Sequence, residues 1–159
     1  MSNAEMSREV ERYWVDFLAQ TGRPADTPLY SAFHFDDNEH DANLLAELVI
    51  RGTKRATASL LWQYGDGGER APVAGDLSVV TDFGGTPLCV IETTAVDIRA
   101  FGDVDADFAA AEGEGDGSLE HWRRVHERYF GRVCEEIGRE PSPRMEVVCE
   151  RFRVIHPTR

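Results

Sequence analysis

The chain is poor in cysteine, and its cysteines form no motif. The 159 residues include three, Cys89, Cys134 and Cys149, which lie far apart and contain no Cys-x-x-Cys pair. An odd, scattered set excludes a disulfide framework and favours buried free thiols in a reducing compartment. Long apolar runs are missing too, because none approaches the roughly 18 residues of a membrane span. We therefore expect a soluble, cytoplasmic protein without a membrane partner.

Basic residues are outnumbered. Lysine and arginine total 17 against 29 acidic residues, which gives a formal net charge of −12. Proteins that follow a long phosphate backbone carry a basic stripe, so this composition argues against such a partner. Acids gather between residues 100 and 122, whereas Arg51, Lys54 and Arg55 form a small basic cluster. We expect a small nucleoside or a short single-stranded RNA as partner; the sequence leaves the oligomeric state open.

The sequence carries no metal or cofactor motif. His121 and His126 are five residues apart, so they do not share a helix face as residues four apart do. The glycine-rich turn Gly65-Asp-Gly-Gly68 lacks the Lys-Ser/Thr ending of a phosphate-binding loop. We expect neither a metal nor a cofactor.

Hydrophobic periodicity predicts a mixture of helices and strands. The helices are expected over 8–19, 40–51, 104–112 and 118–137, and the strands over 30–35, 56–62, 76–82, 86–98 and 145–156. In the second helix, Leu44, Leu45, Leu48 and Val49 are expected to form the buried stripe. This order predicts an α+β fold whose strands close into a small barrel or form a strongly bent sheet. Residues 1–27 are interpreted as a tag remnant and a helix, and 28–156 as the main domain of one compact unit.

Lys54 is a candidate catalytic residue because it is the only lysine beside sixteen arginines. A lysine can lose its proton when it is partly buried, which an arginine does not. Lys54 follows a helix-ending glycine, and Thr57 offers a hydroxyl three residues later. A lysine with a depressed pKa can act as the base of such a hydroxyl. The alternative is an exposed lysine near a helix end, where its charge is favourable.

Acidic and aromatic candidates complete the expected site. Glu112 and Glu114 lie in a glycine-rich break between two helices, where glycine lets the backbone turn tightly and present a carboxylate inward. They are candidate catalytic residues, or else exposed loop charges. Trp62 and Tyr64 are two apart at the end of an expected strand, so they would point the same way and could stack a base. They could equally be core or rim aromatics.

These segments together resemble the ASCH family. The segment Gly52-x-Lys54-x-Ala-Thr57-x-Ser-Leu60 resembles its Gly-x-Lys-x-x-Thr signature. The run from Ala111 to Asp116 and the two patterns that follow it, Ser118-Leu-Glu-x-Trp122 and His126-x-x-Tyr-Phe130, resemble the longer bacterial branch of the family. The final Val148-Cys-Glu-Arg-Phe152 strand also fits, so the resemblance covers roughly residues 28–156.

The resemblance implies a PUA-like small β-barrel with helices packed around it, and a cleft associated with RNA. One small bacterial branch removes the acetyl group from N4-acetylcytidine with a Lys, a Thr and a Glu. Its Lys and Thr correspond to Lys54 and Thr57, and its Glu corresponds to Glu112 or Glu114, of which Glu114 is slightly favoured. We expect an amidohydrolase of N4-acylated cytosine nucleosides. One alternative is an RNA-binding or RNA-cleaving module, with Arg51, Lys54 and Arg55 on phosphate; another is a non-enzymatic nucleoside sensor.

Overall fold

Apart from a two-residue strand at Ser2–Asn3 that was not predicted, the helices and strands follow the predicted order. The computed structural model describes residues 2–3, 6–65 and 67–158. The helices are α1 (Arg8–Gln20), α2 (Glu39–Ile50), α3 (Ala106–Glu112) and α4 (Leu119–Ile137), with short 3-10 turns η1 (Leu61–Gln63) and η2 (Phe101–Asp103). The strands are β1 (Ser2–Asn3), β2 (Ser31–His34), β3 (Ala56–Leu60), β4 (Leu77–Thr81), β5 (Pro87–Ala100) and β6 (Glu146–His156).

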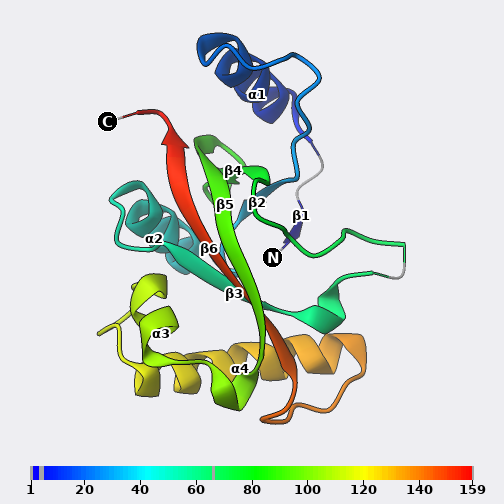
Figure 1. Cartoon of the computed structure of the whole chain (residues 1–159), viewed down its shortest axis with the longest axis vertical. Coiled ribbons are helices and arrows are strands. Elements are labelled where there is room, and N and C mark those ends of the chain that lie inside the picture. The colour runs from blue at the N-terminus through cyan, green and yellow to red at the C-terminus, as the bar shows by residue number, and fades with distance from the viewer. Residues whose placement is uncertain (1, 4–5, 66, 159) are drawn as a thin grey trace.

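The strands form one mixed sheet in the order β1-β2-β4-β5-β6-β3. Only the β2–β4 pair is parallel among the strands that the structure describes. The long strands β5 and β6 curve across the molecule, and the register between them shifts near Thr93, as expected at a β-bulge that bends a strand. The α+β prediction is therefore confirmed, with the sheet curled into a half-barrel (Figure 1).

Three hydrophobic clusters fix the helices on the sheet. One cluster joins α1 to β2, β4 and β5, a second joins α2 to β2, β4, β5 and β6, and the third joins α3 and α4 to β3 and β6. Figure 1 shows α1 at one end of the long strands and the α3–α4 pair at the other. None of the helices within 2–3, 6–65 and 67–158 is long and apolar enough to cross a membrane.

The buried stripe of α2 differs from the prediction. Ala42, Ala46 and Val49 are the fully buried residues, whereas Leu44 is 46% exposed. The small residues face the sheet because they let the helix approach it closely. The prediction is confirmed for Val49 and wrong for Leu44, because hydrophobicity alone does not decide which face of the helix contacts the sheet.

The strand predicted over 56–62 ends two residues early. β3 stops at Leu60, and the chain turns into η1, where the Leu60 backbone N–H donates to the Gln63 side chain at 2.9 Å. Trp62 and Tyr64 therefore do not alternate along one strand, and their expected common direction is wrong. The division of the chain at residue 28 stays a prediction.

Candidate functional site

The connection between α2 and β3 places Lys54 in the interior. Gly52 has a φ of 81°, a left-handed conformation that glycine adopts without strain. The backbone N–H groups of Thr53 and Lys54 then both donate to the carbonyl of Leu48, which closes the helix end. Next, Arg55 N–H donates to the Ala111 carbonyl at 2.7 Å, which docks this segment on the end of α3. Lys54 therefore points into the protein and is only 2% exposed.

The Lys54 ammonium group has three acceptors. Its Nζ donates to the Ala56 carbonyl at 2.8 Å, to Glu112 Oε1 at 3.0 Å and to Glu114 Oε2 at 3.4 Å. The Phe35 ring centroid lies 5.2 Å from the same nitrogen. An ammonium has three N–H groups, so each has a partner. Lys54 is thus the centre of a buried charge cluster.

Glu112 is the most deeply held carboxylate of the cluster. It is 1% exposed, and its Oε2 accepts hydrogen bonds from Trp122 Nε1 and from His126 Nε2, the latter at 3.1 Å. Burial alone would raise the pKa of Glu112, but Lys54 and His126 outweigh it and lower the pKa to about 2. Glu112 is therefore an anion that anchors the cluster rather than a group that exchanges protons near neutral pH.

His126 carries the second positive charge. Its Nδ1 lies 2.9 Å from the Trp122 carbonyl oxygen, and its Nε2 faces the Glu112 carboxylate. Both partners are acceptors, so both ring nitrogens donate and the ring is an imidazolium. Burial would lower the pKa of His126, yet Glu112 reverses the effect and the pKa is raised. The Trp122 ring stacks on the imidazolium at 4.2 Å, an arrangement that favours its charge.

Glu114 is the less buried acid of the cluster. Its side chain is 21% exposed, and its contact with Lys54 is the longest of the three. Burial and the negative charge of Glu112 raise the pKa of Glu114, whereas the positive charge of Lys54 lowers it. The net result is a raised pKa. Of the two candidate glutamates, Glu114 is the one better suited to accept and return a proton.

Glycine makes this arrangement of glutamates possible. Gly113 ends α3 in a left-handed conformation with φ 66°, between the two acids. A Cβ built on Gly113 would overlap the carbonyl oxygen of Thr53. The absence of a side chain therefore lets the Glu112–Glu114 backbone lie against the chain that carries Lys54.

A pocket with a volume of about 230 Å³ opens beside the cluster. Its lining includes Lys54, Thr57, Glu112, Glu114 and His126. Thr57 is 6% exposed, and within the described residues no hydrogen bond engages its hydroxyl. The structure thus brings the four predicted catalytic residues to one pocket, with a hydroxyl that remains available to a ligand.

The expected depression of the Lys54 pKa is wrong. Burial does lower the pKa of this lysine, but the charges of Glu112 and Glu114 outweigh burial, and the pKa is raised above its ordinary value. With all three N–H groups engaged, Lys54 has no lone pair to accept the hydroxyl proton. The sequence indicated a buried lysine but could not show that two carboxylates would surround it.

The same cluster has the spacing of a metal site. One ligand atom each from Glu112, Glu114 and His126 lies within 4.8 Å of the others. Lys54 Nζ contacts both carboxylates, however, so an ammonium occupies the position that a cation would take. A metal could bind only if Lys54 moved away or lost its proton.

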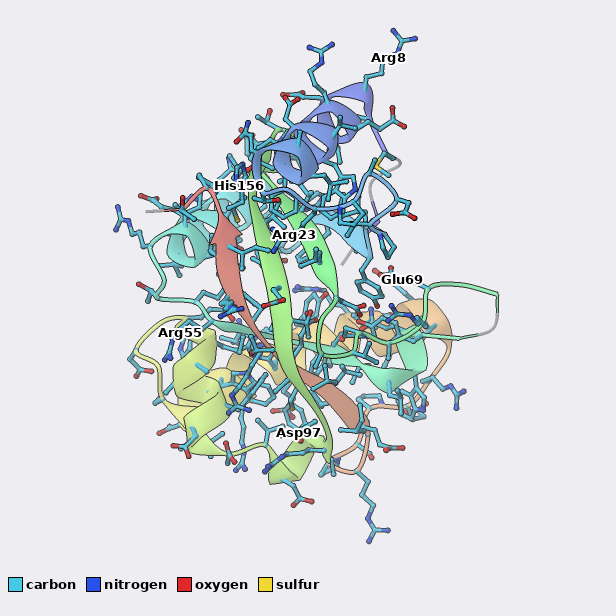
Figure 2. All side chains as sticks on the ribbon, turned by 45° about the horizontal axis from the view of Figure 1, so that its top comes forward. Arg8, Arg23, Arg55, Glu69, Asp97 and His156 are labelled. Carbon is cyan, nitrogen blue, oxygen red and sulfur yellow. The ribbon has the colours of Figure 1, made fainter. Side chains whose placement is uncertain are left out.

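The four predicted substrate-binding residues lie outside this pocket. Arg51 pairs with Glu47 on the surface, and Arg51 and Arg55 line another hollow beside β6 that shares Lys54 with this pocket. Trp62 packs under the guanidinium of Arg139 at 5.0 Å, and Tyr64 lines a second pocket. Figure 2 shows Arg55 and Glu69, another residue of that second pocket, on opposite sides of the β5 and β6 ribbons. Arg51 and Arg55 precede β3, and for Trp62 and Tyr64 the reason is that η1 turns the chain away from the strand.

Trp122 and His126 are site residues that the sequence analysis did not select. They are four apart on α4, so they share one face, and both contact Glu112. The four-residue spacing of Trp122 and His126 was the signal in the sequence that could have indicated this pair. Arg128 and Arg132 repeat the spacing at the same pocket and were also missed.

The anchoring of Glu112 predicts a loss of stability in acid. Its folded pKa of about 2 lies below the ordinary 4.5, so it stabilises the fold above pH 4.5 and this contribution disappears as the pH falls toward 2. We expect urea titrations to show the free energy of unfolding falling across that window. Glu112→Gln should flatten the fall, while Glu135→Gln, an exposed change on α4, should keep it. Equal slopes in the two variants would contradict the assignment.

Known proteins resemble this chain in both sequence and structure. The chain matches the model of the ASCH domain over residues 31–156. It is 39% identical to an ASCH domain from Lactobacillus crispatus, with a TM-score of 0.87 over 94% of this chain and 95% of the other. A protein from Enterococcus faecalis is 32% identical, with a TM-score of 0.84 over 93% of this chain and 88% of the other. No curated protein matches. The likeness extends over the PUA-like half-barrel and its helices.

Proposed function

We propose that this chain, which belongs to the ASCH domain family, is an amidohydrolase that removes the acyl group from an N4-acylated cytosine nucleoside. The observation that carries the proposal is the pocket in which Thr57 presents an unengaged hydroxyl beside the Lys54–Glu112–Glu114 cluster. A nucleophile, a carboxylate with a raised pKa and a fixed positive charge are the components that acyl transfer needs.

Thr57, Glu114 and Lys54 have distinct roles in the proposed reaction. Thr57 Oγ1 attacks the acyl carbon, and Glu114 accepts the hydroxyl proton. When the C–N bond breaks, Glu114 returns that proton to the exocyclic nitrogen, and the acyl group stays on Thr57 as an ester. Water, activated by Glu114, then hydrolyses the ester and frees Thr57. Lys54 holds Glu114 in place and favours its anionic state.

The charge of the cluster suits a neutral ligand. Lys54 and His126 supply two positive charges, and ionised Glu112 and Glu114 supply two negative charges. The sum is zero in a chain whose net charge is −12. A nucleoside without phosphate enters such a site without electrostatic repulsion, unlike a long polyanion.

The direct test is the release of acetate from N4-acetylcytidine. We expect chromatography to show conversion to cytidine by the wild-type protein, little or none by Thr57→Ala, and substantial conversion by Thr57→Ser, which keeps a hydroxyl. The exposed neighbour Thr53→Ala serves as the matched control and should be fully active. If the wild-type protein releases no more acetate than Thr57→Ala does, the proposal fails.

An RNA-binding module is the second candidate. Arg128 and Arg132 line the same pocket, are exposed and form no ion pair within the described residues. Two arginines one turn apart can contact phosphate oxygens. Binding of a short cytidine-containing RNA that weakens steeply with salt, without acyl release, would favour this candidate.

A further inference from the structure

A second pocket lies beside the first, over the strands β3 and β6. Its volume is about 160 Å³. Hydroxyl, carboxyl, amide and aromatic groups line it: Tyr30, Ser31, Phe33, Ser59, Gln63, Tyr64, Glu69, Ser78 and Glu150. None of these residues belongs to the charge cluster, so the reaction proposed above leaves this pocket without a role.

Strand register places this second pocket beside the first. Thr57 pairs with Glu150 across β3 and β6, and Ser59 is two residues further along β3. Directly paired residues point to the same face with Cβ atoms roughly 4.5–5.5 Å apart. Glu150 is therefore the cross-strand neighbour of the proposed nucleophile.

The walls of the two pockets are also continuous. Phe33 of the second pocket and Phe35 of the first lie with ring centroids 5.1 Å apart. Neither hollow alone reaches the roughly 300 Å³ at which ligand pockets begin, whereas the two together do. The two hollows are best understood as halves of one site.

Glu150 presents one free oxygen to the second pocket. It is 6% exposed, and Thr93 donates to its Oε2 at 2.7 Å. Across the described residues, this is the sole hydrogen bond to the carboxyl group. Oε1 therefore remains without a protein donor.

The surroundings keep the Glu150 carboxyl partly protonated near neutral pH. The pKa of Glu150 is raised to about 7, chiefly by burial. The charges of Asp76 and Glu69 also raise this pKa, whereas the hydrogen bond from Thr93 and, more weakly, the charge of Lys54 lower it. Tyr64 and Tyr30 also face this carboxyl, and both hydroxyls are already engaged, by Ser59 and by the Arg70 carbonyl. The carboxyl can thus be a hydrogen-bond donor as well as an acceptor.

We propose that the second pocket is the base-binding half of the site, in which the Glu150 carboxyl pairs with the N3/N4 edge of a cytosine ring. This inference rests on the proposed function and names the part of the substrate that the charge cluster does not contact. A neutral carboxyl donates its O–H to N3 and accepts the N4–H, which gives two parallel hydrogen bonds. Phe33, Tyr30 and Tyr64 supply aromatic surface for the ring.

The pairing has a consequence for ligand choice that depends on pH. An ionised carboxylate has no proton for cytosine N3, and the two lone pairs then repel each other. Uracil offers an N3–H instead, so an ionised carboxylate still accepts a hydrogen bond from it. Cytidine should therefore lose affinity as the pH rises through the pKa of Glu150, whereas uridine should not.

Calorimetric binding of cytidine and uridine tests the proposal. Over a range from about pH 6 to about pH 9, we expect cytidine affinity for the wild-type protein to fall roughly 5- to 100-fold, the value of one bidentate pair. Glu150→Gln keeps a donor and an acceptor but cannot ionise, so it should bind cytidine equally at both extremes. Glu146→Gln, an exposed change on the same strand, should behave as the wild type.

Each outcome decides the proposal. It is overturned if cytidine does not bind the wild-type protein, if affinity falls in parallel in the wild type and Glu150→Gln, or if uridine shows the same fall. Should Glu150→Gln fail to fold, carboxyl ¹³C NMR of the wild-type protein decides instead, because bound cytidine must raise the pKa of Glu150. Acetate release from N4-acetylcytidine without this pH dependence would leave the amidohydrolase standing and remove the base site. Conversely, the pH dependence of cytidine binding without acetate release would support the base site and remove the amidohydrolase.

Discussion

Replacing Lys54 by methionine is expected to lower the free energy of unfolding by about 3–5 kcal/mol, the usual cost of removing one partner of a buried ion pair. Methionine has a similar length and fits the apolar surroundings of the side chain, so packing changes little. The loss arises because Glu112, at 1% exposure, keeps its charge while its main counter-ion disappears. Urea denaturation near neutral pH measures it, with the exposed Arg55→Met as control.

A double-mutant cycle separates charge from packing. Adding Glu112→Gln to Lys54→Met removes the uncompensated charge, so the double variant should regain part of the lost stability. Residues in direct contact show interaction energies of roughly 0.5–3 kcal/mol in such cycles. Additive losses would mean that Lys54 stabilises the fold through its aliphatic chain and that the ion pair contributes little.

Replacing Glu114 by glutamine is expected to lower the turnover of N4-acetylcytidine by about 10²–10⁴, the range for loss of a general acid–base group. Glutamine preserves the shape and still accepts a hydrogen bond from Lys54, so folding and substrate binding should change little. The effect should therefore fall on kcat rather than on KM. Steady-state kinetics measures it, with the exposed Glu120→Gln as control.

The pH profile gives the same prediction a second readout. Glu114 must be ionised to accept the Thr57 proton, and its pKa is raised. Turnover by the wild-type protein should therefore increase with pH through a limb above the ordinary glutamate value of 4.5. Glu114→Gln should lose that limb. A variant that keeps both the rate and the limb would assign the proton transfer to another group.

Much of the fold could be predicted because local signals and tertiary packing agree. In α4, Trp122, Phe130 and Val133 recur at helical spacing and are all buried, and Gly138 ends the helix in a left-handed conformation. In α2 the signals disagree, because the requirement for close approach to the sheet favours Ala42 and Ala46 over the larger leucines. Sequence periodicity shows that a helix is amphipathic, but the partner surface decides which residues contact it.

Lys54, Thr57 and the two glutamates of the candidate site were predictable, whereas Trp122, His126 and the protonation of the site were not. Lys54 is a unique residue type in this chain, and Glu112 and Glu114 lie beside glycines that permit a tight turn. The raised pKa of Lys54 depends on its contacts with Glu112, which is 58 positions away in the sequence, and with Glu114, which is 60 positions away. No local sequence pattern contains contacts over such separations. The same holds for Glu150, whose importance follows from its pairing with Thr57 across β3 and β6.

Gly113 bears on how distant relatives of this chain should be searched for. A pattern built on chemical groups would require Lys54, Thr57 and the two glutamates, and would leave the position between the glutamates open. Any side chain at that position overlaps the Thr53 carbonyl, next to Lys54. A homologue with the four reactive residues but a larger residue at 113 would have to separate these two backbones, and its lysine would lie away from both acids. A discriminating search pattern therefore weights this glycine as heavily as the lysine.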